Sequence, residues 1–487
     1  MQKHYVENVR NYIGGEWTPS TGTESVTVAN PATGNKLGAV PMGTSRDVDA
    51  AVAAAKNAFN TWRDVPVAVR SRYLFDLRNL MEQNYDELLS ICTQEHGKTL
   101  EESKGDVRRG IDNVETAAGM PSLMMGQCLE QVATGIDSIS HRQPMGVFAC
   151  IAPYNFPSMV PLWFLPYAIA TGNTFVVKPS EQVPFSQHRL FELIDKLKLP
   201  KGVVNMVHGG KDVVNALLEH RDIAGVSFVG SSPVAEHVYN RCGATKKRCQ
   251  ALGGAKNFTT VTDDCDWDKS VANIIDSAFG CAGQRCLATS VVVGVGAAYG
   301  RLKEKLAEGI KKIKVGEGHQ PGVTMGPVIS ARHKERVLAY IEKGIKEGAE
   351  LVVDGRDCKV DGYPHGHWVG PTLFAKVGPE MTIGKEEIFG PALSLVEARD
   401  LDAAIAMTNA HPLANASSIY TQNGSHARKF AKEIHASMVG VNIGVAAPMS
   451  YFTFGGNKGS FFGDLKAHGR DSVSFYTQNK TQIQRWW

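Results

Sequence analysis

A cysteine beside an arginine is the first feature of the sequence that could do chemistry. The segment Phe279–Cys286 has the sequence F-G-C-A-G-Q-R-C, so two glycines bend it and Arg285 directly precedes Cys286. Thiolate is the reactive form of cysteine, and a neighbouring positive charge lowers the thiol pKa from about 8.5. We therefore expect Cys286 to be a nucleophile. The alternative is a small buried hydrophobic residue, which is the role expected for Cys281.

A lysine and a glutamate follow a predicted strand. Lys178 and Glu181 come directly after the apolar run Thr174–Val177. Open α/β sheets bind ligands at the carboxyl ends of their strands, so this pair could contact a ligand. Taken alone, the two residues fit a solvated surface pair better than a ligand contact.

The elements that must position these residues alternate in type along the chain. Short β-branched runs alternate with amphipathic segments from Gly146 to Leu252, and a second such series runs from Phe258 to Tyr420. This alternation is typical of βαβ units with a parallel sheet and helices on both faces. The pattern therefore predicts two α/β lobes.

Two further segments are predicted from their composition. The apolar stretch Met159–Ala170 is interrupted by Pro161 and Pro166, so we expect a buried helix that is too short to span a bilayer. The tail Ser472–Trp487 is expected to be an extended strand. It is too polar to form a core alone, so it should pair with another element or subunit.

Composition and charge exclude several classes of protein. The chain has 487 residues, is 43% hydrophobic and 21% charged, and carries a net charge of +3, which favours a globular protein with small-molecule partners over one that binds nucleic acid or membrane. Nine scattered cysteines without a C-x-x-C spacing predict neither a disulfide framework nor a metal site. With a polar N-terminus that lacks a secretory signal, these cysteines favour the cytoplasm.

Several standard catalytic motifs are missing. Gly97-Lys98-Thr99 resembles the end of a P-loop, but Cys92 stands where the first glycine is required. The sequence also has no G-x-S-x-G, H-E-x-x-H or G-x-G-x-x-G motif. The sequence therefore does not predict a serine hydrolase, a zinc protease or a dinucleotide-binding site with the standard Rossmann motif.

Five separated motifs together resemble the aldehyde dehydrogenase superfamily in order and spacing. They are Pro153–Pro157, Lys178–Glu181, Phe228–Ser231, Gly283–Cys286 and Glu386–Pro391, within an agreement that extends from about Tyr12 to Tyr476. The segments Gly254–Asn257 and Lys458–Leu465 are most similar to the methylmalonate semialdehyde dehydrogenase branch, which acylates coenzyme A.

The resemblance implies an α/β fold of the aldehyde dehydrogenase type with three parts. A Rossmann-type NAD-binding lobe would comprise residues 1–122 and 146–251, and an α/β catalytic lobe would comprise 252–445. Segments 123–145 and 466–487 would bridge subunits of a homo-oligomer, either a dimer or a tetramer.

The resemblance also implies roles for individual residues. Cys286 would attack the aldehyde, and the side chain of Asn155 would hold the oxyanion together with the backbone N–H of Cys286. The residues implied to bind the cofactor are Phe156, Lys178, Glu181, Gly230, Ser231, Glu387 and Phe389. Glu181 would repel a 2′-phosphate, which favours NAD over NADP. Ala235 stands where the family often has a second glycine.

One departure from the family pattern points to the acceptor of the acyl group. Leu252 occupies the position at which hydrolytic members carry the glutamate that activates water. Without that base, the thioacyl-enzyme should wait for a thiol, namely coenzyme A. A base supplied by another residue would instead make the protein a hydrolytic NAD-dependent aldehyde dehydrogenase that releases a free acid. A catalytically idle homologue is the third possibility.

Two arginines match those that this branch uses for a substrate carboxylate. Arg109 and Arg285 are the residues implied, because a planar guanidinium can hold a carboxylate with two hydrogen bonds. Arg108 is an alternative to Arg109 at the same motif. The implied reaction converts malonate or methylmalonate semialdehyde, NAD and coenzyme A to acetyl- or propionyl-coenzyme A, carbon dioxide and NADH.

Overall fold

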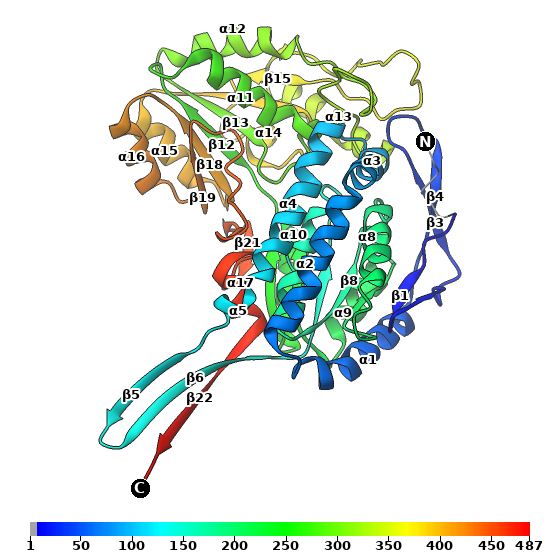
Figure 1. The fold of residues 1–487 in the computed structure, drawn as a ribbon. Helices are drawn as coiled ribbons and strands as arrows, with labels where there is room; N and C mark the ends of the chain where they lie inside the picture. The colour runs from blue at the N-terminus through cyan, green and yellow to red at the C-terminus, as the bar shows by residue number, and fades with distance from the viewer. Residues whose placement is uncertain (1–6) are drawn as a thin grey trace.

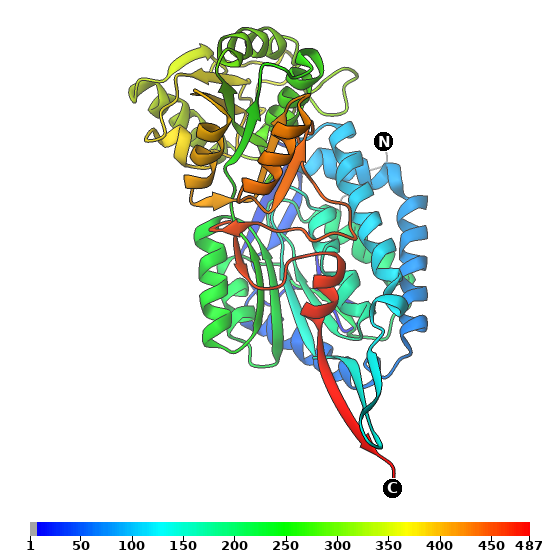
Figure 2. The same cartoon turned by 90° about the vertical axis from the view of Figure 1, so that its left-hand side faces the viewer.

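The structure is a computed structural model that describes residues 7–487. The first six residues of the predicted segment 1–122 lie outside this range. Two large sheets are each packed against helices, and a narrow three-stranded sheet projects away from them together with the C-terminus (Figure 1). The predicted α/β class is confirmed. Figure 2 shows the two large units one above the other, with the projecting sheet below.

The first sheet has eight strands, and five neighbouring strands in its interior run parallel to one another. These five are β9 (Val204–Met206), β8 (Thr174–Lys178), β7 (Val147–Ile151), β10 (Ile223–Val229) and β11 (Arg248–Leu252). Antiparallel strands complete both edges: β1 (Asn11–Ile13) and β2 (Glu16–Thr18) beside β9, and β21 (Phe461–Gly463) beside β11.

Alternating side chains of this sheet pack on opposite faces. In β7, Phe148 and Cys150 belong to one apolar cluster, whereas Val147 and Ala149 belong to another, as the two-residue period of a strand requires. The first cluster joins α2 (Val67–Gln83), α3 (Tyr85–His96), α4 (Leu100–Ala118), α5 (Met120–Leu123) and α8 (Phe185–Lys196). The second joins α1 (Ser45–Trp62), α9 (Lys211–Glu219) and α10 (Ser232–Ala244).

The second sheet has seven strands and a separate apolar core. Its order is β14 (Glu350–Val353), β15 (Thr372–Ala375), β16 (Ala392–Ala398), β13 (Thr289–Val295), β12 (Asn257–Val261), β18 (Ala416–Tyr420) and β19 (Met438–Val441), with only β14 antiparallel. Its helices are α11 (Trp267–Phe279), α12 (Ala298–Ile310), α13 (Ala331–Lys346), α14 (Thr382–Lys385), α15 (Leu401–Ala410) and α16 (Gly424–Glu433).

The projecting sheet joins two distant parts of the chain. Strand β6 (Ile136–Pro144) lies between β5 (Gln127–Ala133) and β22 (Thr477–Arg485), and both neighbours are antiparallel to it. Leu129 and Ile483 are 65% and 72% exposed on this sheet. Two small ribbons complete the fold, β3 (Ser25–Ala29) with β4 (Lys36–Pro41), and β17 (Leu413–Ala414) with β20 (Asn457–Lys458).

The tail prediction is partly wrong. Strand β22 pairs with another element as expected, but the residues before it form helix α17 (Gly469–Tyr476). Val473 and Tyr476 of α17 are buried in the first apolar cluster, and the Tyr476 hydroxyl lies 3.0 Å from that of Ser227. Burial of these few apolar side chains stabilises the helix. The tail is mostly polar, so its composition does not predict this helix.

The single helix predicted over Met159–Ala170 is also wrong. The structure has two short buried helices there, α6 (Met159–Leu162) and α7 (Leu165–Ala170). Pro166 lies in the first turn of α7, where its missing N–H is tolerated, so the chain breaks before it. Within residues 7–487, no helix combines the length and the apolar character that crossing a membrane requires.

Candidate active site

The segment that carries Cys286 leaves helix α11 through a left-handed turn. The φ angle is 51° at Cys281, 52° at Ala282 and 71° at Gly283. A Cβ atom at Gly283 would lie 2.2 Å from the carbonyl oxygen of Gly390, so this close approach requires glycine. The turn brings Cys286 to the junction between the two large sheets, because α11 packs on one and Cys286 contacts the apolar core of the other.

The Cys286 backbone is fixed, and its thiol is neutral at rest. The Cys286 carbonyl accepts hydrogen bonds from the side-chain amides of Asn257 at 3.0 Å and Asn415 at 2.9 Å. Burial and the nearby charge of Glu387 raise the thiol pKa to about 12. The sequence predicts the opposite direction, because Arg285 directly precedes this cysteine.

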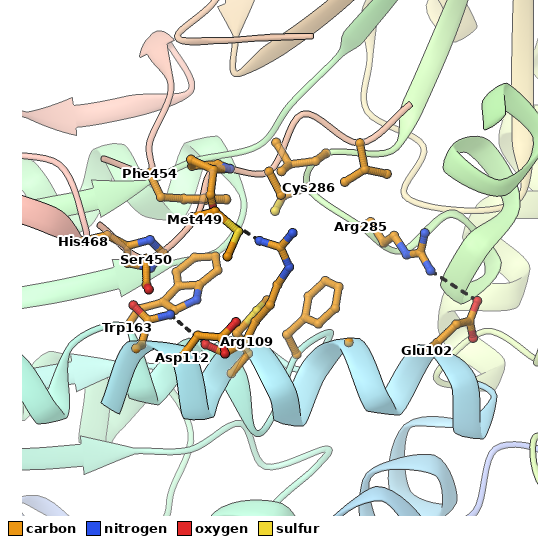
Figure 3. Close-up of a pocket in the computed structure, with 18 of the residues that line it drawn as sticks. Glu102, Arg109, Asp112, Trp163, Arg285, Cys286, Met449, Ser450, Phe454 and His468 are labelled. Atoms are coloured by element: carbon orange, nitrogen blue, oxygen red, sulfur yellow. Dashed lines mark hydrogen bonds and ion pairs between the residues drawn. The ribbon is translucent and has the colours of Figure 1, made fainter. Parts of the chain in front are cut away.

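The side chain of Arg285 explains that difference, because it turns away from Cys286 (Figure 3). Its Nε donates to the sulfur of Cys281 at 3.3 Å, and its Nη2 donates to Glu102 at 3.5 Å. Although burial disfavours its charge, Cys281 and Glu102 keep the pKa of Arg285 above its usual value. Adjacency in sequence therefore does not provide the electrostatic neighbour that we predicted for Cys286.

A cavity of about 350 Å³ opens beside Cys286, and Arg109 and Arg285 also line it. Figure 3 shows Arg109 rising from helix α4 toward the cysteine. The wall is largely aromatic and apolar, and carboxylates contribute to the lining. The aromatic and apolar lining residues include Phe156, Met159, Trp163 and Phe454. The carboxylates are Glu101, Glu102, Asp112 and Asp276.

Helix α4 separates the two arginine candidates. Arg109 is half-buried in the cavity and donates to the carbonyl of Pro448 at 3.1 Å, and burial lowers its pKa. Arg108 instead forms two hydrogen bonds to Glu82, at 2.6 and 2.9 Å, and lies over the ring of Tyr85. Adjacent residues lie about 100° apart around a helix, so only one of the two faces the cavity.

The Asn155 side chain contacts the loop that carries Cys286. It is buried, and its Nδ2 donates to the carbonyl of Gln284 at 3.0 Å. The Gln284 side chain in turn accepts from the backbone N–H of Ile329 and donates to the carbonyl of Cys281. The Asn155 amide is therefore bound to Gln284, which precedes Cys286 by two residues in the sequence.

Lys178 and Glu181 form a pair at the carboxyl end of β8. The Lys178 Nζ lies 3.0 Å from Glu181 Oε2, and Lys178 is buried whereas Glu181 is partly exposed. Burial opposes the charge of Glu181, but the attraction of Lys178 and hydrogen bonds lower its pKa overall. The carboxylate is therefore ionised at neutral pH and accessible from the sheet edge.

Gly230 and Ser231 link β10 to helix α10 at the same edge of the sheet. The Gly230 N–H donates to the carbonyl of Leu252 at 3.1 Å. Ser231 is the N-cap of α10, and no side chain caps the first turn of this helix. Ala235 is buried inside the helix. Leu252 is buried at the end of β11, so this position presents a hydrocarbon side chain.

Glu387 and Phe389 lie on the segment that follows α14. Glu387 Oε1 accepts the N–H of Ala255 at 3.1 Å, and burial raises its pKa to about 7. Phe389 adopts a left-handed φ of 58°, and its ring meets that of Tyr154 edge-on, with centroids 5.9 Å apart. The Phe389 carbonyl contacts the His333 ring nitrogen at 2.7 Å.

Apart from Asn155, which contacts Gln284, the structure distributes the predicted residues over three places. Cys286, Arg109, Arg285 and Phe156 line the cavity, although Phe156 was predicted to contact the cofactor. Lys178, Glu181, Gly230 and Ser231 lie at the edge of the first sheet, and Glu387 and Phe389 lie on the second unit. Sequence reasoning missed Trp163, Phe454 and His468 in the cavity wall, because they come from separate segments that no motif joins.

Comparisons with known proteins agree along nearly the whole chain. The model of the aldehyde dehydrogenase family matches residues 17–482. Malonate-semialdehyde dehydrogenase 2 of Geobacillus thermodenitrificans is 52% identical over 98% of this chain and 99% of its own length. The malonate-semialdehyde dehydrogenase of Halalkalibacterium halodurans is 50% identical over 99% of each chain.

Solved structures give the same result. The methylmalonate-semialdehyde dehydrogenase of Oceanimonas doudoroffii superposes with a TM-score of 0.97 at 45% identity and covers 99% of both chains. A Sinorhizobium meliloti protein in complex with NAD has a TM-score of 0.97 at 42% identity, with the same coverage.

Proposed function

Because the chain belongs to the aldehyde dehydrogenase family, we propose that it oxidises malonate or methylmalonate semialdehyde with NAD and transfers the decarboxylated acyl group to coenzyme A. One observation carries the proposal: Cys286 and a half-buried arginine, Arg109, line the same cavity. Cys286 suits the aldehyde carbon of such a substrate, and Arg109 suits its carboxylate. The names of the relatives at about 50% identity support the same substrates.

The residues at the edge of the first sheet fit NAD. The first turn of α10 has no side-chain cap, and the N–H groups of Ser232 and Val234 would bind a pyrophosphate, because Pro233 has no N–H and that of Ala235 donates to the Ser231 carbonyl. The Glu181 carboxylate beside Lys178 would accept hydrogen bonds from the adenine-ribose hydroxyls and repel a 2′-phosphate. Glu387, and with it Phe389, would contact the nicotinamide riboside. When bound, NAD supplies the acceptor for the hydride that leaves the substrate carbon.

Cys286 and Asn155 carry out the first chemical step in this proposal. The Cys286 thiolate attacks the aldehyde carbon, and the resulting oxyanion accepts hydrogen bonds from the Asn155 amide and the Cys286 backbone N–H. An amide has two N–H donors, so Asn155 can keep its bond to Gln284 while it donates to the oxyanion. Donors of this kind contribute roughly 10² to 10³ in rate. Loss of hydride then leaves a thioester on Cys286.

Decarboxylation follows from the position of the carboxylate on the α-carbon. Loss of carbon dioxide from the thioester leaves an enolate, which the same two donors can stabilise until the α-carbon takes a proton. Because Arg109 binds the carboxylate in the ground state, this step would require the cavity to loosen or rehydrate. The sulfur of coenzyme A then attacks the thioester and releases the Cys286 thiol. The products are acetyl-coenzyme A from malonate semialdehyde and propionyl-coenzyme A from methylmalonate semialdehyde.

Leu252 favours coenzyme A over water as the acyl acceptor. Its buried hydrocarbon side chain cannot deprotonate water, so hydrolysis should be slow. The alternative, a hydrolytic enzyme that releases malonate or methylmalonate, would need a base from elsewhere. We further infer a homo-oligomer joined through the projecting sheet. The nine cysteines are all free, which suits the reducing cytoplasm.

The decisive experiment measures NADH formation from malonate semialdehyde, methylmalonate semialdehyde and propanal, each with and without coenzyme A. We expect sustained turnover of the semialdehydes only with coenzyme A, release of carbon dioxide, and a higher kcat/KM with NAD than with NADP. Steady release of free acid without coenzyme A would favour the hydrolytic alternative. Formation of malonyl-coenzyme A without carbon dioxide would contradict the decarboxylation.

A further inference from the structure

A fully buried ion pair lies beneath the Asn155 segment. Lys98 and Asp106 have side-chain exposures of 0%, and Lys98 Nζ lies 3.0 Å from Asp106 Oδ2. Removing two charges from water is unfavourable, and apolar residues of similar volume often stabilise a protein as well as such a pair does. A contribution to stability is therefore a weak explanation for these two residues, and their other contacts suggest a different one.

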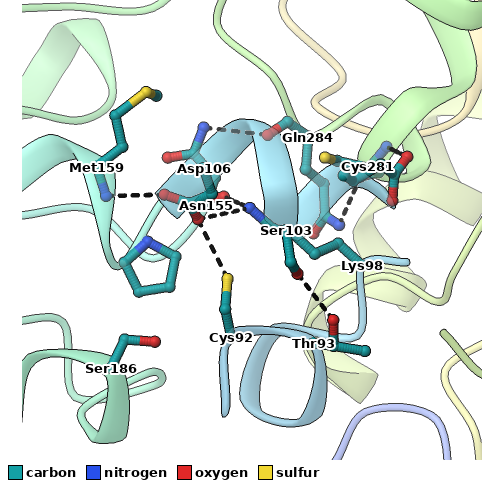
Figure 4. Close-up of polar contacts among 12 residues, drawn as sticks. Cys92, Thr93, Lys98, Ser103, Asp106, Asn155, Met159, Ser186, Cys281 and Gln284 are labelled. Atoms are coloured by element: carbon teal, nitrogen blue, oxygen red, sulfur yellow. Dashed lines mark hydrogen bonds and ion pairs between the residues drawn. The ribbon is translucent and has the colours of Figure 1, made fainter. Parts of the chain in front are cut away.

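Those contacts fasten both ends of the segment from Asn155 to Met159 (Figure 4). Lys98 Nζ donates to the carbonyl of Asn155 at 2.7 Å, and Asp106 Oδ1 accepts the N–H of Met159 at 2.7 Å. Between these ends, the Gln187 side chain donates to the carbonyl of Pro157 at 2.6 Å. The backbone of this turn is thus held by side chains from α4, from α8 and from Lys98, which lies between α3 and α4.

The same lysine also fixes the cavity wall. Its Nζ lies 4.1 Å from the centre of the Phe156 ring, which is a cation–π contact, and Phe156 lines the cavity. Lys98 itself lines no part of the cavity beside Cys286. The segment Gly97-Lys98-Thr99 resembles the end of a P-loop in sequence. Its lysine donates to the backbone carbonyl of Asn155.

The consequence concerns the direction of the Asn155 amide. The carbonyl that Lys98 holds and the side chain that contacts Gln284 share one Cα atom, so rotation of the peptide plane would swing the amide. An oxyanion donor is effective only when it is oriented before the reaction begins, because reorientation during the reaction adds to the barrier.

We propose that Lys98, with Asp106, is a positioning residue that orients Asn155 toward the oxyanion formed at Cys286. It acts through Asn155 and touches neither the substrate nor the cofactor. The inference rests on the proposed role of Asn155, but it requires neither coenzyme A nor a substrate carboxylate.

A double-mutant cycle on the full-length protein tests this proposal. The variant Lys98→Met/Asp106→Asn removes both charges, so no charge is left buried alone, and it is combined with Asn155→Ala. The readout is the first-turnover burst of NADH from propanal. We expect the charge-neutral variant to lose at least tenfold in burst rate, while the Kd for NAD stays within twofold of the wild type. In the Asn155→Ala background, the same change should cost less than twofold.

A matched control and a second variant keep the test decisive. Cys92 donates to the same Asp106 oxygen at 3.2 Å, so Cys92→Ala should keep the wild-type burst rate. If the charge-neutral variant does not fold, Gln187→Met replaces it in the same cycle, because it releases only the Pro157 carbonyl. An equal loss with and without Asn155, or an unchanged burst, would overturn the proposal.

The choice of propanal separates this inference from the proposed function. A wild-type protein that oxidises propanal but rejects semialdehydes or coenzyme A would contradict the proposed substrates and leave the cycle valid. An Asn155→Ala variant with an unchanged burst would remove the oxyanion role of Asn155 and overturn the inference.

Discussion

The protonation state of Cys286 illustrates how much a single residue depends on its surroundings. Its neighbour in sequence is a cation, yet that cation contacts the sulfur of Cys281, and the charge that influences Cys286 is the carboxylate of Glu387. The resting thiol is neutral at physiological pH because its pKa is raised to about 12. In the proposed reaction, activation of Cys286 therefore has to come from changes in the site when substrate and cofactor bind.

This electrostatic arrangement predicts how fast Cys286 is alkylated in the ligand-free protein. The rate with iodoacetamide should rise roughly tenfold per pH unit between pH 7 and 10, because the thiolate fraction does so below the pKa. Glu387→Gln should accelerate it roughly three- to tenfold at pH 8.5, because the pKa of Glu387 is about 7 and its charge is fully present there. Peptide mapping by mass spectrometry follows Cys286 separately from the other cysteines.

The matched control for this experiment is Glu386→Gln. Glu386 is exposed and accepts a hydrogen bond from Tyr340, so its removal should leave the alkylation rate nearly unchanged. A Glu387→Gln variant that reacts more slowly than the wild type would contradict the assigned electrostatics. Faster alkylation of Cys281 than of Cys286 would contradict the choice of nucleophile, since Cys281 is fully buried.

At the scale of elements, helix α4 determines which side chain faces the cavity beside Cys286. Thr99 caps it, with a reciprocal hydrogen bond from its own N–H to the Glu102 side chain. This start fixes the rotation of the helix, so Arg109 faces the cavity and Arg108 faces Glu82. The same helix also contributes Asp106 to the buried ion pair. One helix thus carries both the proposed substrate contact, Arg109, and part of the ion pair beneath Asn155.

The two faces of α4 predict opposite effects for neighbouring substitutions. Arg109→Leu should lower kcat/KM for both semialdehydes roughly 10- to 150-fold, because a hydrogen bond to a charged group contributes about 1.5–3 kcal/mol. It should barely affect propanal, which has no carboxylate. Steady-state kinetics with the three aldehydes measure this difference.

Arg108→Leu provides the control on the same helix. Its pair with Glu82 is partly exposed, so we expect a loss of at most about 1 kcal/mol of stability and unchanged kinetics for all three aldehydes. An equal loss of kcat/KM for propanal and semialdehydes in Arg109→Leu would remove this arginine from carboxylate recognition.

The whole molecule has one part that its own core does not stabilise. The projecting sheet has three strands, and large hydrophobic side chains are exposed on it and at its end, including Leu129 at 65%, Ile483 at 72% and Trp486 at 76%. Three strands with little packing are marginal alone, so a second surface should cover them. A further copy of this chain is the partner that fits the proposed homo-oligomer.

Substitution on this sheet tests the assembly. The wild type should sediment as a dimer or tetramer in analytical ultracentrifugation at micromolar concentration, and Leu129→Lys/Ile483→Lys should shift it to smaller species, because charges there oppose burial. Val26→Lys, at a residue 43% exposed on strand β3, is the control and should leave the assembly unchanged. A monomeric wild type would contradict the oligomer, and an unchanged double variant would contradict this interface.

Much of the architecture is determined by local patterns in the sequence. The alternation of β-branched runs and amphipathic segments predicts the two α/β units, because the two-residue period of strands and the 3.6-residue period of helices are properties of short segments. The motif around Cys286 likewise predicts a reactive cysteine, and the polar pair after Thr174–Val177 predicts a ligand contact at the end of a strand.

Only the tertiary structure decided where charges meet. It directed Arg285 to Cys281 and Arg109 to the cavity, joined Lys98 to the carbonyl of Asn155, and folded the start of the polar tail into a buried helix. The physical reason is that electrostatic and packing energies depend on distances between segments that are remote in sequence, and burial strengthens those energies by removing water. Local residue patterns carry no information about those distances.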